Sequence, residues 1–239
     1  MQPVLVIAAV ERELALLVRG MHGEHVSDSL LPSEWLGRVG SCDVVCAASG
    51  IGKVNAASAA TALILRWQPR LIICTGCAGA YPAGGMQVGE LAVASSEISG
   101  DEGVLTPEGW QSLEAIGIPS LEIKGQRYFN EIPLSFSAAE QAFQLAAALD
   151  IPLRRGRFVT VSTCSGTAGR GHDLYERFGG LCENMEGAAV ARVALQYGID
   201  CLELRGISNM VEDRDLSRWN LTLAVEQAQR FILRHLEQL

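Results

Sequence analysis

Carboxylate, amide and guanidinium groups follow or open several apolar stretches of this 239-residue chain. Glu11 and Glu13 come directly after the first apolar stretch, Glu186 opens a segment of small residues, and Arg205 and Asn209 border a later apolar stretch. In α/β proteins ligands bind at the carboxyl ends of strands, so Glu11 or Glu13 is a candidate general acid or base. Each carboxylate also fits a plain interaction with a helix dipole. Packing of a core does not require polar side chains at three separate strand ends, so their presence indicates a binding site.

A glycine-rich segment, Ser49-Gly50-Ile51-Gly52, stands between an apolar stretch and an alanine-rich one. Backbone N–H groups at the start of a helix bind anions or polar sugars, which makes this segment a candidate ligand loop. It is not a P-loop, because Ala47 occupies the place of the first glycine and Val54 that of the hydroxyl residue. A tight structural turn fits the same residues equally well.

Cys74 and Cys77 have the spacing of a zinc or redox pair. A zinc site needs four ligands, and neither a second cysteine pair nor a histidine pair accompanies them. No serine, histidine and aspartate are arranged in an order that suggests a hydrolase triad. We therefore expect neither a metal nor an organic cofactor.

Short apolar runs alternate with longer amphipathic runs, which is the pattern of a sheet covered by helices. The predicted strands are residues 4–9, 44–48, 71–75, 88–95, 157–162 and 201–207. The predicted helices are residues 11–21, 53–67, 137–149, 186–197 and 219–239, the third with a capping box of Ser137 and Glu140. Residues 100–133 are the least regular part and are predicted to form loops. No repeat or linker is evident, so we expect a single α/β domain over residues 1–239.

Composition narrows the class of partner. The net charge is -8 and none of the 19 basic residues form a run, which argues against nucleic-acid binding. No apolar segment approaches the roughly 20 residues that span a bilayer, and the amino terminus has no signal-peptide pattern. The odd number of cysteines, seven, indicates reduced thiols. These features predict a cytoplasmic protein that binds a small molecule.

Together, five segments resemble the family of purine nucleoside phosphorylases and nucleosidases, especially the methylthioadenosine/S-adenosylhomocysteine nucleosidases. The segments are 9–13 (AVERE), 49–54 (SGIGKV), 75–79 (TGCAG), 184–189 (NMEGAA) and 205–209 (RGISN), and they run almost from end to end. The resemblance implies a central mixed, twisted β-sheet flanked by helices. It also implies a role for each matching residue. Glu13 would activate water, and Arg205 would help to hold that water. Glu186 would bind the ribose hydroxyls, Met185 would pack on the ribose, and Trp219 would line the pocket for the 5' substituent. The remaining matching residues would contact the substrate: Ser49, Gly50, Ile51, Cys77, Ala78 and Gly79.

Asn209 departs from the adenine-specific nucleosidases, which have aspartate at this position. An amide can donate to O6 of hypoxanthine and accept from a protonated N7, whereas a carboxylate would face O6 acceptor to acceptor. The segment 205–215 resembles the futalosine hydrolase branch of the family, whose substrate carries hypoxanthine. Futalosine also carries a 3-carboxyphenyl group, for which Arg214 is a candidate partner. A surface ion pair of Arg214 with Asp213 or Asp215 is the alternative.

The resemblance therefore implies hydrolysis of futalosine to hypoxanthine and dehypoxanthine futalosine, a step of menaquinone biosynthesis. Cys74 stands where the bacterial phosphorylases place a phosphate-binding arginine, which favours water over phosphate as nucleophile. The alternatives are a methylthioadenosine-type nucleosidase, a 6-oxopurine nucleoside phosphorylase and a catalytically silent nucleoside-binding protein. We expect a homo-oligomer, a dimer or a multiple of one.

Overall fold

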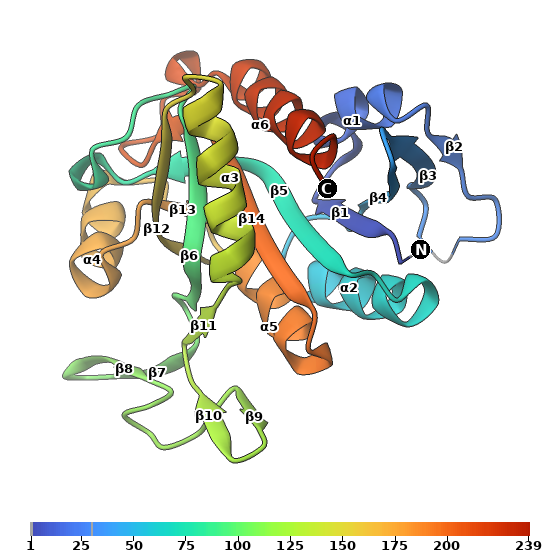
Figure 1. The fold of residues 1–239 in the computed structure, drawn as a ribbon. Coiled ribbons are helices and arrows are strands. Elements are labelled where there is room, and N and C mark those ends of the chain that lie inside the picture. The colour runs from blue at the N-terminus through green and yellow to red at the C-terminus, as the bar shows by residue number, and fades with distance from the viewer. Residues whose placement is uncertain (1, 30) are drawn as a thin grey trace.

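The computed structural model describes residues 2–29 and 31–239, and a ten-stranded mixed β-sheet forms its centre (Figure 1). Its strands are β1 (Val4–Ala8), β2 (Glu24–His25), β3 (Glu34–Val39), β4 (Cys42–Ala48), β5 (Leu71–Ala80), β6 (Leu91–Ser99), β11 (Glu131–Pro133), β12 (Leu153–Thr160), β13 (Cys182–Asn184) and β14 (Asp200–Met210). The order across the sheet is β11-β6-β12-β13-β5-β1-β4-β3-β2, and β14 pairs with both β5 and β6. The α/β fold with a central mixed sheet is confirmed.

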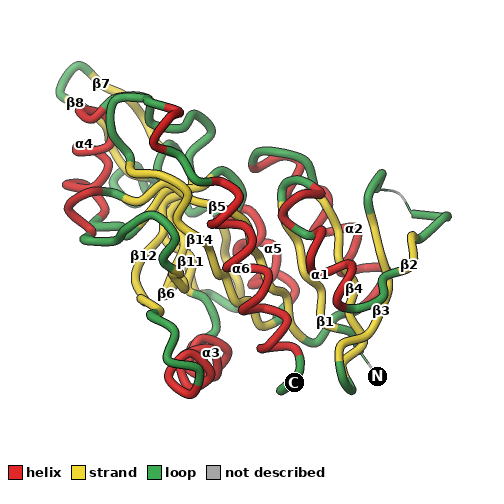
Figure 2. The backbone as a smooth tube through the Cα atoms, turned by 90° about the horizontal axis from the view of Figure 1, so that it is seen from above, coloured by secondary structure: helices red, strands yellow, loops and turns green. Residues whose placement is uncertain are grey.

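Helices cover both faces of this sheet (Figure 2). They are α1 (Ala15–Gly20), α2 (Lys53–Trp67), α3 (Phe136–Ala148), α4 (Ala168–Phe178), α5 (Gly187–Tyr197) and α6 (Leu221–Leu236), with the short 3-10 helices η1 (Glu11–Glu13), η2 (Pro82–Gly84) and η3 (Leu216–Arg218). In the described residues, no helix has both the length and the apolar character needed to cross a membrane.

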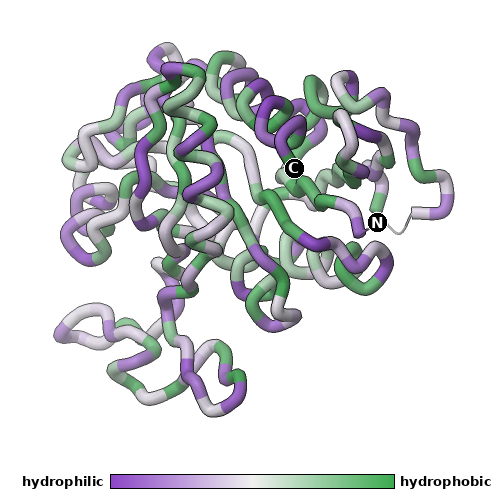
Figure 3. Tube along the Cα trace, in the orientation of Figure 1, coloured by the Kyte–Doolittle hydropathy of each residue, from purple (hydrophilic) through white to green (hydrophobic). Residues whose placement is uncertain are grey.

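The alternation of side chains along β1 explains the two helical layers. Val4 and Val6 pack in the core beneath α1, α3 and α6, whereas Leu5 and Ile7 pack on the other face beneath α2 and α5. Successive side chains of a strand point to opposite faces, so a strand that is apolar throughout needs cover on both sides. In Figure 3 the helix α6 carries both hydrophilic and hydrophobic segments, as expected for a helix that rests one face on the sheet.

Several predicted boundaries are wrong. The predicted helix 11–21 is a 3-10 turn, η1, followed by the short helix α1, with Leu14 between them. Ser135 caps α3 by accepting a hydrogen bond from the N–H of Ala138, so Ser137 is not the cap. The strands β5 and β14 each continue several residues beyond their predicted ends, and this extension brings residues 77–80 and 208–210 into the sheet.

Residues 100–133 are more regular than predicted. They contain two antiparallel hairpins, β7 (Gly103–Thr106) with β8 (Gly109–Ser112) and β9 (Leu121–Ile123) with β10 (Gln126–Tyr128), and then the edge strand β11. The hairpins project from the body of the molecule (Figure 1). Their strands are too short and too exposed to show the alternating pattern from which a strand is predicted.

Candidate active site

A cavity lies at the carboxyl ends of β1, β5, β13 and β14. Ten of the thirteen residues proposed from the sequence line it: Glu13, Ile51, Cys77, Ala78, Gly79, Met185, Glu186, Arg205, Asn209 and Trp219. The lining also includes eight residues that were not proposed: Ala9, Val10, Arg12, Cys164, Ser165, Glu183, Asn184 and Ser208. The strands β1, β5 and β14 run parallel and end at the same edge, whereas β13 runs antiparallel to β5 and meets it at Gly79 and Ala80, so segments far apart in the sequence come together here.

Ser49, Gly50 and Arg214 are absent from this lining. The Ser49 hydroxyl is within donating distance of the carbonyls of Ala8 and Gly50, and the N–H of Gly50 donates to the carbonyl of Ala9, so the start of the glycine segment is held against the end of β1. A contact of Ser49 or Gly50 with a ligand remains a prediction. Ile51, the next residue, does line the cavity and is 58% exposed.

Glu13 is held at the cavity by backbone donors. It is buried, and its carboxylate accepts from the N–H of Cys77 at 3.0 Å and from that of Val10 at 3.3 Å. Gly76 has φ +143, and a Cβ built there would lie 2.7 Å from Oε1 of Glu13 and 2.9 Å from Nη1 of Arg205. A side chain at position 76 would therefore fill the space between these two groups.

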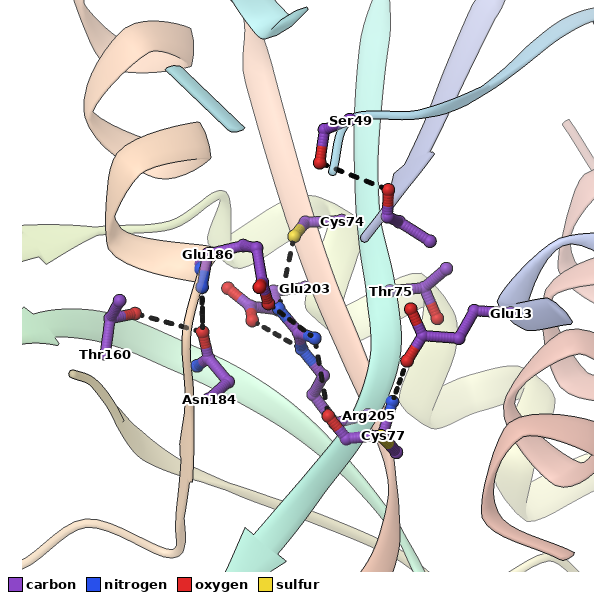
Figure 4. A network of polar contacts seen from close by, with 12 residues as sticks. Glu13, Ser49, Cys74, Thr75, Cys77, Thr160, Asn184, Glu186, Glu203 and Arg205 are labelled. Atoms are coloured by element: carbon purple, nitrogen blue, oxygen red, sulfur yellow. Dashed lines mark hydrogen bonds and ion pairs between the residues drawn. The ribbon is translucent and has the colours of Figure 1, made fainter. Parts of the chain in front are cut away.

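Arg205 is the buried cation of the site (Figure 4). Its Nε donates to Oε1 of Glu203 at 2.8 Å, and its Nη1 lies 3.7 Å from Oε2 of Glu186. Burial lowers the pKa of Arg205, but the neighbouring carboxylates, Glu203 first, more than offset that effect and raise it well above its ordinary value. The guanidinium therefore carries a positive charge that its carboxylate neighbours hold in place.

Glu186 stands just before α5 and joins two parts of the site. It accepts from the N–H of Gly52 at 2.9 Å, so the glycine segment contacts the helix that follows β13. Burial raises the pKa of Glu186, while Arg205 and the Gly52 N–H act in the opposite direction. The contact with a charged Arg205 shows that Glu186 does more than interact with a helix dipole.

Asn209 is positioned by its neighbour. Ser208 Oγ donates to Asn209 Oδ1 at 2.7 Å, and Asn209 Nδ2 donates to the carbonyl of Met210 at 3.1 Å. An amide has two N–H groups and an oxygen with two lone pairs, so one donor and one acceptor of Asn209 stay available in the cavity.

Two buried carboxylates, Glu97 and Glu203, lie behind Arg205, and sequence reasoning missed both. Asn184 Nδ2 donates to one oxygen of Glu97 at 2.6 Å, and Thr160 donates to the other at 2.7 Å. A Cβ on Gly187 would lie 2.2 Å from an oxygen of Glu97 and 2.4 Å from both oxygens of Glu203, so the two carboxyl groups meet over this glycine.

The closeness of the two carboxyl groups favours the protonated form of Glu97. Burial, followed by the charge of Glu203, raises the pKa of Glu97 well above its ordinary value. Oε2 of Glu203 has no other donor within the described residues. A protonated Glu97 would supply that donor, while the other oxygen of Glu203 accepts from Nε of Arg205. This arrangement avoids an unpaired buried charge.

Replacing Glu97 with glutamine is expected to preserve the fold and flatten the pH dependence of its stability. The folded protein keeps a proton that the unfolded chain releases above a pKa of about 4.3. The free energy of unfolding of the parent protein should therefore fall as pH rises towards the raised folded pKa, by up to about 1.4 kcal/mol per pH unit. Glutamine stays neutral, and Thr160 can turn to Asn184, 3.1 Å away. Urea unfolding between about pH 5 and 8 measures this, and parallel curves would contradict a protonated Glu97.

Arg214 lies over the ring of Trp219, with its guanidinium carbon 4.9 Å from the ring centroid. The proposed surface ion pair is not formed in the described part of the chain. Asp213 accepts from the N–H of Ala168 instead, and Asp215 accepts from Ser217. Arg214 therefore reaches the cavity only through Trp219. Arg12, which is exposed, is the cation other than Arg205 in the lining.

No group of three or more histidine, cysteine, aspartate or glutamate side chains is arranged to hold a metal ion within residues 2–29 and 31–239. Cys74, of the Cys74 and Cys77 pair, is buried and contacts Arg205 through its sulfur at 3.5 Å. Cys77 lines the cavity, and its N–H donates a hydrogen bond to the carboxylate of Glu13. Both cysteines lie in β5, where Cys74 packs beside Arg205 and Cys77 lines the cavity.

Comparison with known proteins shows the family of this chain. The model of the phosphorylase superfamily matches residues 3–237. The chain belongs to the phosphorylase superfamily. It is 35% identical over 190 residues to a futalosine hydrolase of Thermus thermophilus, covering 80% of each chain. It is 29% identical to a 5'-methylthioadenosine/S-adenosylhomocysteine nucleosidase of a Geobacillus species, covering 87% of this chain and 85% of that one.

A solved structure shows the same fold. The 5'-methylthioadenosine/S-adenosylhomocysteine nucleosidase of Neisseria meningitidis superposes with a TM-score of 0.86 at 23% identity, covering 100% of both chains. Superfamily membership accounts for the sheet and for the position of the cavity at its edge. A shared fold does not by itself determine the substrate, which depends on individual side chains of the site.

Proposed function

We propose that this member of the superfamily hydrolyses the N-glycosidic bond of futalosine and releases hypoxanthine. The observation that carries the proposal is the buried amide of Asn209 in the same cavity as Glu13 and Glu186. An amide matches the O6 and N7 edge of a 6-oxopurine, as argued from the sequence. The 35% identity to the futalosine hydrolase of Thermus thermophilus supports the same substrate.

The proposed reaction proceeds through an oxocarbenium-like sugar. The bond between C1' and the base breaks, and its electron pair leaves with hypoxanthine. N7 of the base takes up a proton from solvent and donates to the carbonyl of Asn209, while the amide NH2 donates to O6. Water attacks C1' and gives a proton to Glu13. Glu186 binds the ribose hydroxyls, and Arg205 helps to hold the water.

We expect water rather than phosphate as the nucleophile, because Arg205, the buried cation of the site, is not free to bind a phosphate. Arg205 is already engaged by Glu203, Glu186 and the sulfur of Cys74. An incoming dianion would compete with these buried partners. We therefore expect turnover that does not depend on phosphate.

The experiment that tests the proposal is incubation with futalosine, inosine, adenosine and methylthioadenosine, with and without phosphate, while free base is measured. Release of hypoxanthine from futalosine, without need for phosphate, is the expected result. Preferred release of adenine would favour a methylthioadenosine-type nucleosidase. Phosphate-dependent release would favour a phosphorylase, and binding without release would favour a silent nucleoside-binding protein.

Two arginines are proposed to recognise the carboxylate of the 3-carboxyphenyl group. Arg12 lines the cavity, and Arg214 lies on Trp219, which lines it too. Replacing Arg12 with alanine is expected to lower kcat/KM for futalosine by roughly 10- to 100-fold, the value of a charge-assisted hydrogen bond, and to spare inosine, which lacks the carboxylate. Arg214→Ala should act in the same direction. Steady-state kinetics on both substrates measures these effects.

Arg19→Ala is the matched control, because Arg19 is an exposed arginine of α1 outside the cavity. It removes the same charge and should leave both substrates unaffected. Equal losses on futalosine and inosine in Arg12→Ala would rule out carboxylate recognition by Arg12.

We also propose a cytoplasmic homo-oligomer. All seven cysteines are free thiols, which suits a reducing compartment. Ile51, Val54 and Leu65, at the start and on the outside of α2, are 58%, 84% and 64% exposed, and a second copy of the chain would cover them. Light scattering of the purified protein tests the assembly, and a monomer at micromolar concentration would contradict it.

A further inference from the structure

Glu183 and Asn209 stand on either side of Gly79 in one row across the sheet. In β13, Glu183 pairs with Gly79 of β5, and in β14, Asn209 pairs with the same glycine. Paired residues of neighbouring strands point to the same face of a sheet. All three residues line the cavity. The cavity thus has a bare backbone floor with a carboxylate on one side and an amide on the other.

Gly79 keeps this floor open. A Cβ built on it would lie 3.0 Å from a methyl of Val211 and 3.1 Å from Nδ2 of Asn209. A side chain at position 79 would crowd the amide and occupy the space between the two polar groups. A flat purine ring needs such a gap between its two hydrogen-bonding edges.

Glu183 is held as an acceptor. It is 5% exposed, and Oε1 accepts from the N–H of Ser165 at 2.7 Å. Oε2 accepts from the hydroxyls of Ser165 at 2.7 Å and Tyr81 at 3.2 Å. Every protein group that contacts this carboxylate donates to it. A carboxylate offers about four lone pairs, so an acceptor position is left for a ligand.

We propose that Glu183 accepts a hydrogen bond from N1–H of a 6-oxopurine while Asn209 binds its O6 and N7 edge. This inference rests on the proposed function and names a second residue that selects the base. N1 of hypoxanthine carries a hydrogen, whereas N1 of adenine is an acceptor with no hydrogen to give. A carboxylate at this position favours the first base and repels the second.

A purely structural role for Glu183 makes a different prediction. If the carboxylate only anchors Ser165, its loss should weaken hypoxanthine and adenine alike. If it accepts from N1–H, its loss should weaken hypoxanthine selectively, because that hydrogen is then left without a partner. The ratio of the two affinities separates these roles, and a change in stability does not.

The test measures binding of free hypoxanthine and free adenine by calorimetry in the parent protein, Glu183→Ala and Glu183→Gln. We expect the parent to prefer hypoxanthine, and Glu183→Ala to lower the hypoxanthine-to-adenine affinity ratio by about 10-fold or more. Glu183→Gln keeps the shape of the side chain and loses the charge, so its ratio should fall by less. It also keeps the test informative if the alanine variant does not fold.

Tyr81→Phe is the matched control. Tyr81 is buried outside the lining of the cavity and donates to the same carboxylate, so its loss perturbs Glu183 without removing the acceptor. Its affinity ratio should stay within about twofold of the parent's. A ratio unchanged in both Glu183 variants, or lowered equally in Tyr81→Phe, would overturn the inference.

Failure of this inference is distinguishable from failure of the proposed function. Release of hypoxanthine from futalosine with a ratio independent of Glu183 would overturn the inference and leave the function standing. A Glu183-dependent preference for hypoxanthine without turnover of futalosine would support the inference and reject the substrate. A parent protein that binds adenine more tightly would reject both.

Discussion

Glu13→Gln is expected to lower kcat by about 10²- to 10⁴-fold, the usual contribution of a positioned general base. Glutamine keeps the shape of the side chain but cannot take a proton from water. Its oxygen can still accept from the N–H of Cys77, while its NH2 group would face the N–H of Val10. We therefore expect a small loss of stability, on the order of 1 kcal/mol, beside the large loss of turnover.

Steady-state kinetics, thermal unfolding and hypoxanthine binding together measure this prediction, and base affinity should change little. Glu11→Gln is the matched control. Glu11 is an exposed carboxylate two residues away that accepts a hydrogen bond from Ser33 and lies outside the cavity lining. Near-parent turnover in Glu13→Gln, or equal losses in the two variants, would remove Glu13 from the mechanism.

Asn209→Asp is expected to change the ratio of kcat/KM for futalosine over its 6-amino analogue by about 10- to 100-fold. The change replaces the NH2 group of the amide by an acceptor with almost no change of volume. A carboxylate would face O6 of hypoxanthine, and it would also face the carbonyl of Met210, to which Nδ2 now donates at 3.1 Å. Leaving such buried groups unpaired costs about 1 to 3 kcal/mol.

Asn220→Asp provides the control for this prediction. Asn220 caps α6 by accepting from the N–H of Leu223 at 3.0 Å, and an aspartate retains that acceptor. The same chemical change outside the cavity should leave the substrate ratio unaltered. If the ratio also stays unaltered in Asn209→Asp, Asn209 does not bind position 6 of the base, and the main reason for preferring a 6-oxopurine is lost.

The two positions act on different parts of the reaction. In the proposed reaction Glu13 acts on the water and the sugar, so its loss should affect all substrates equally. Asn209 and Glu183 are proposed to bind the base, so their loss should change the choice among substrates. A single panel of 6-oxo and 6-amino nucleosides, applied to all variants, separates these effects.

The amino-acid sequence alone determined the α/β fold and most of the cavity. Alternating apolar and amphipathic runs are local patterns, and they located β1, β4, α2 and α5 within a few residues. The glycine at position 198, with φ +68, ends α5 where the sequence predicted. Motifs placed directly after strands, such as Glu13, met at one edge of the sheet because parallel strands end there.

The family resemblance named Glu13 rather than Glu11, and only the tertiary structure gives the physical reason. The 3-10 turn η1 directs Glu13 inward to the N–H of Cys77 and leaves Glu11 at the surface, a difference that residue type and spacing do not contain. The tertiary structure likewise showed Arg214 on the ring of Trp219 and not in the alternative ion pair with Asp213 or Asp215. Such choices depend on distances between segments that are remote in sequence.

Glu97, Glu183 and Glu203 show the same limit most clearly. Each lies in a strand, and in the sequence a single glutamate in a strand is not distinguishable from an ordinary polar residue. In the structure each of the three is 5% exposed or less. Their roles arise from tertiary neighbours: strand register brings Glu183 and Asn209 to either side of Gly79, and Glu97 and Glu203 meet over Gly187. The hydrogen-bond partners, burial and protonation of such a side chain depend on its neighbours in the folded chain, and only the tertiary structure brings those neighbours together.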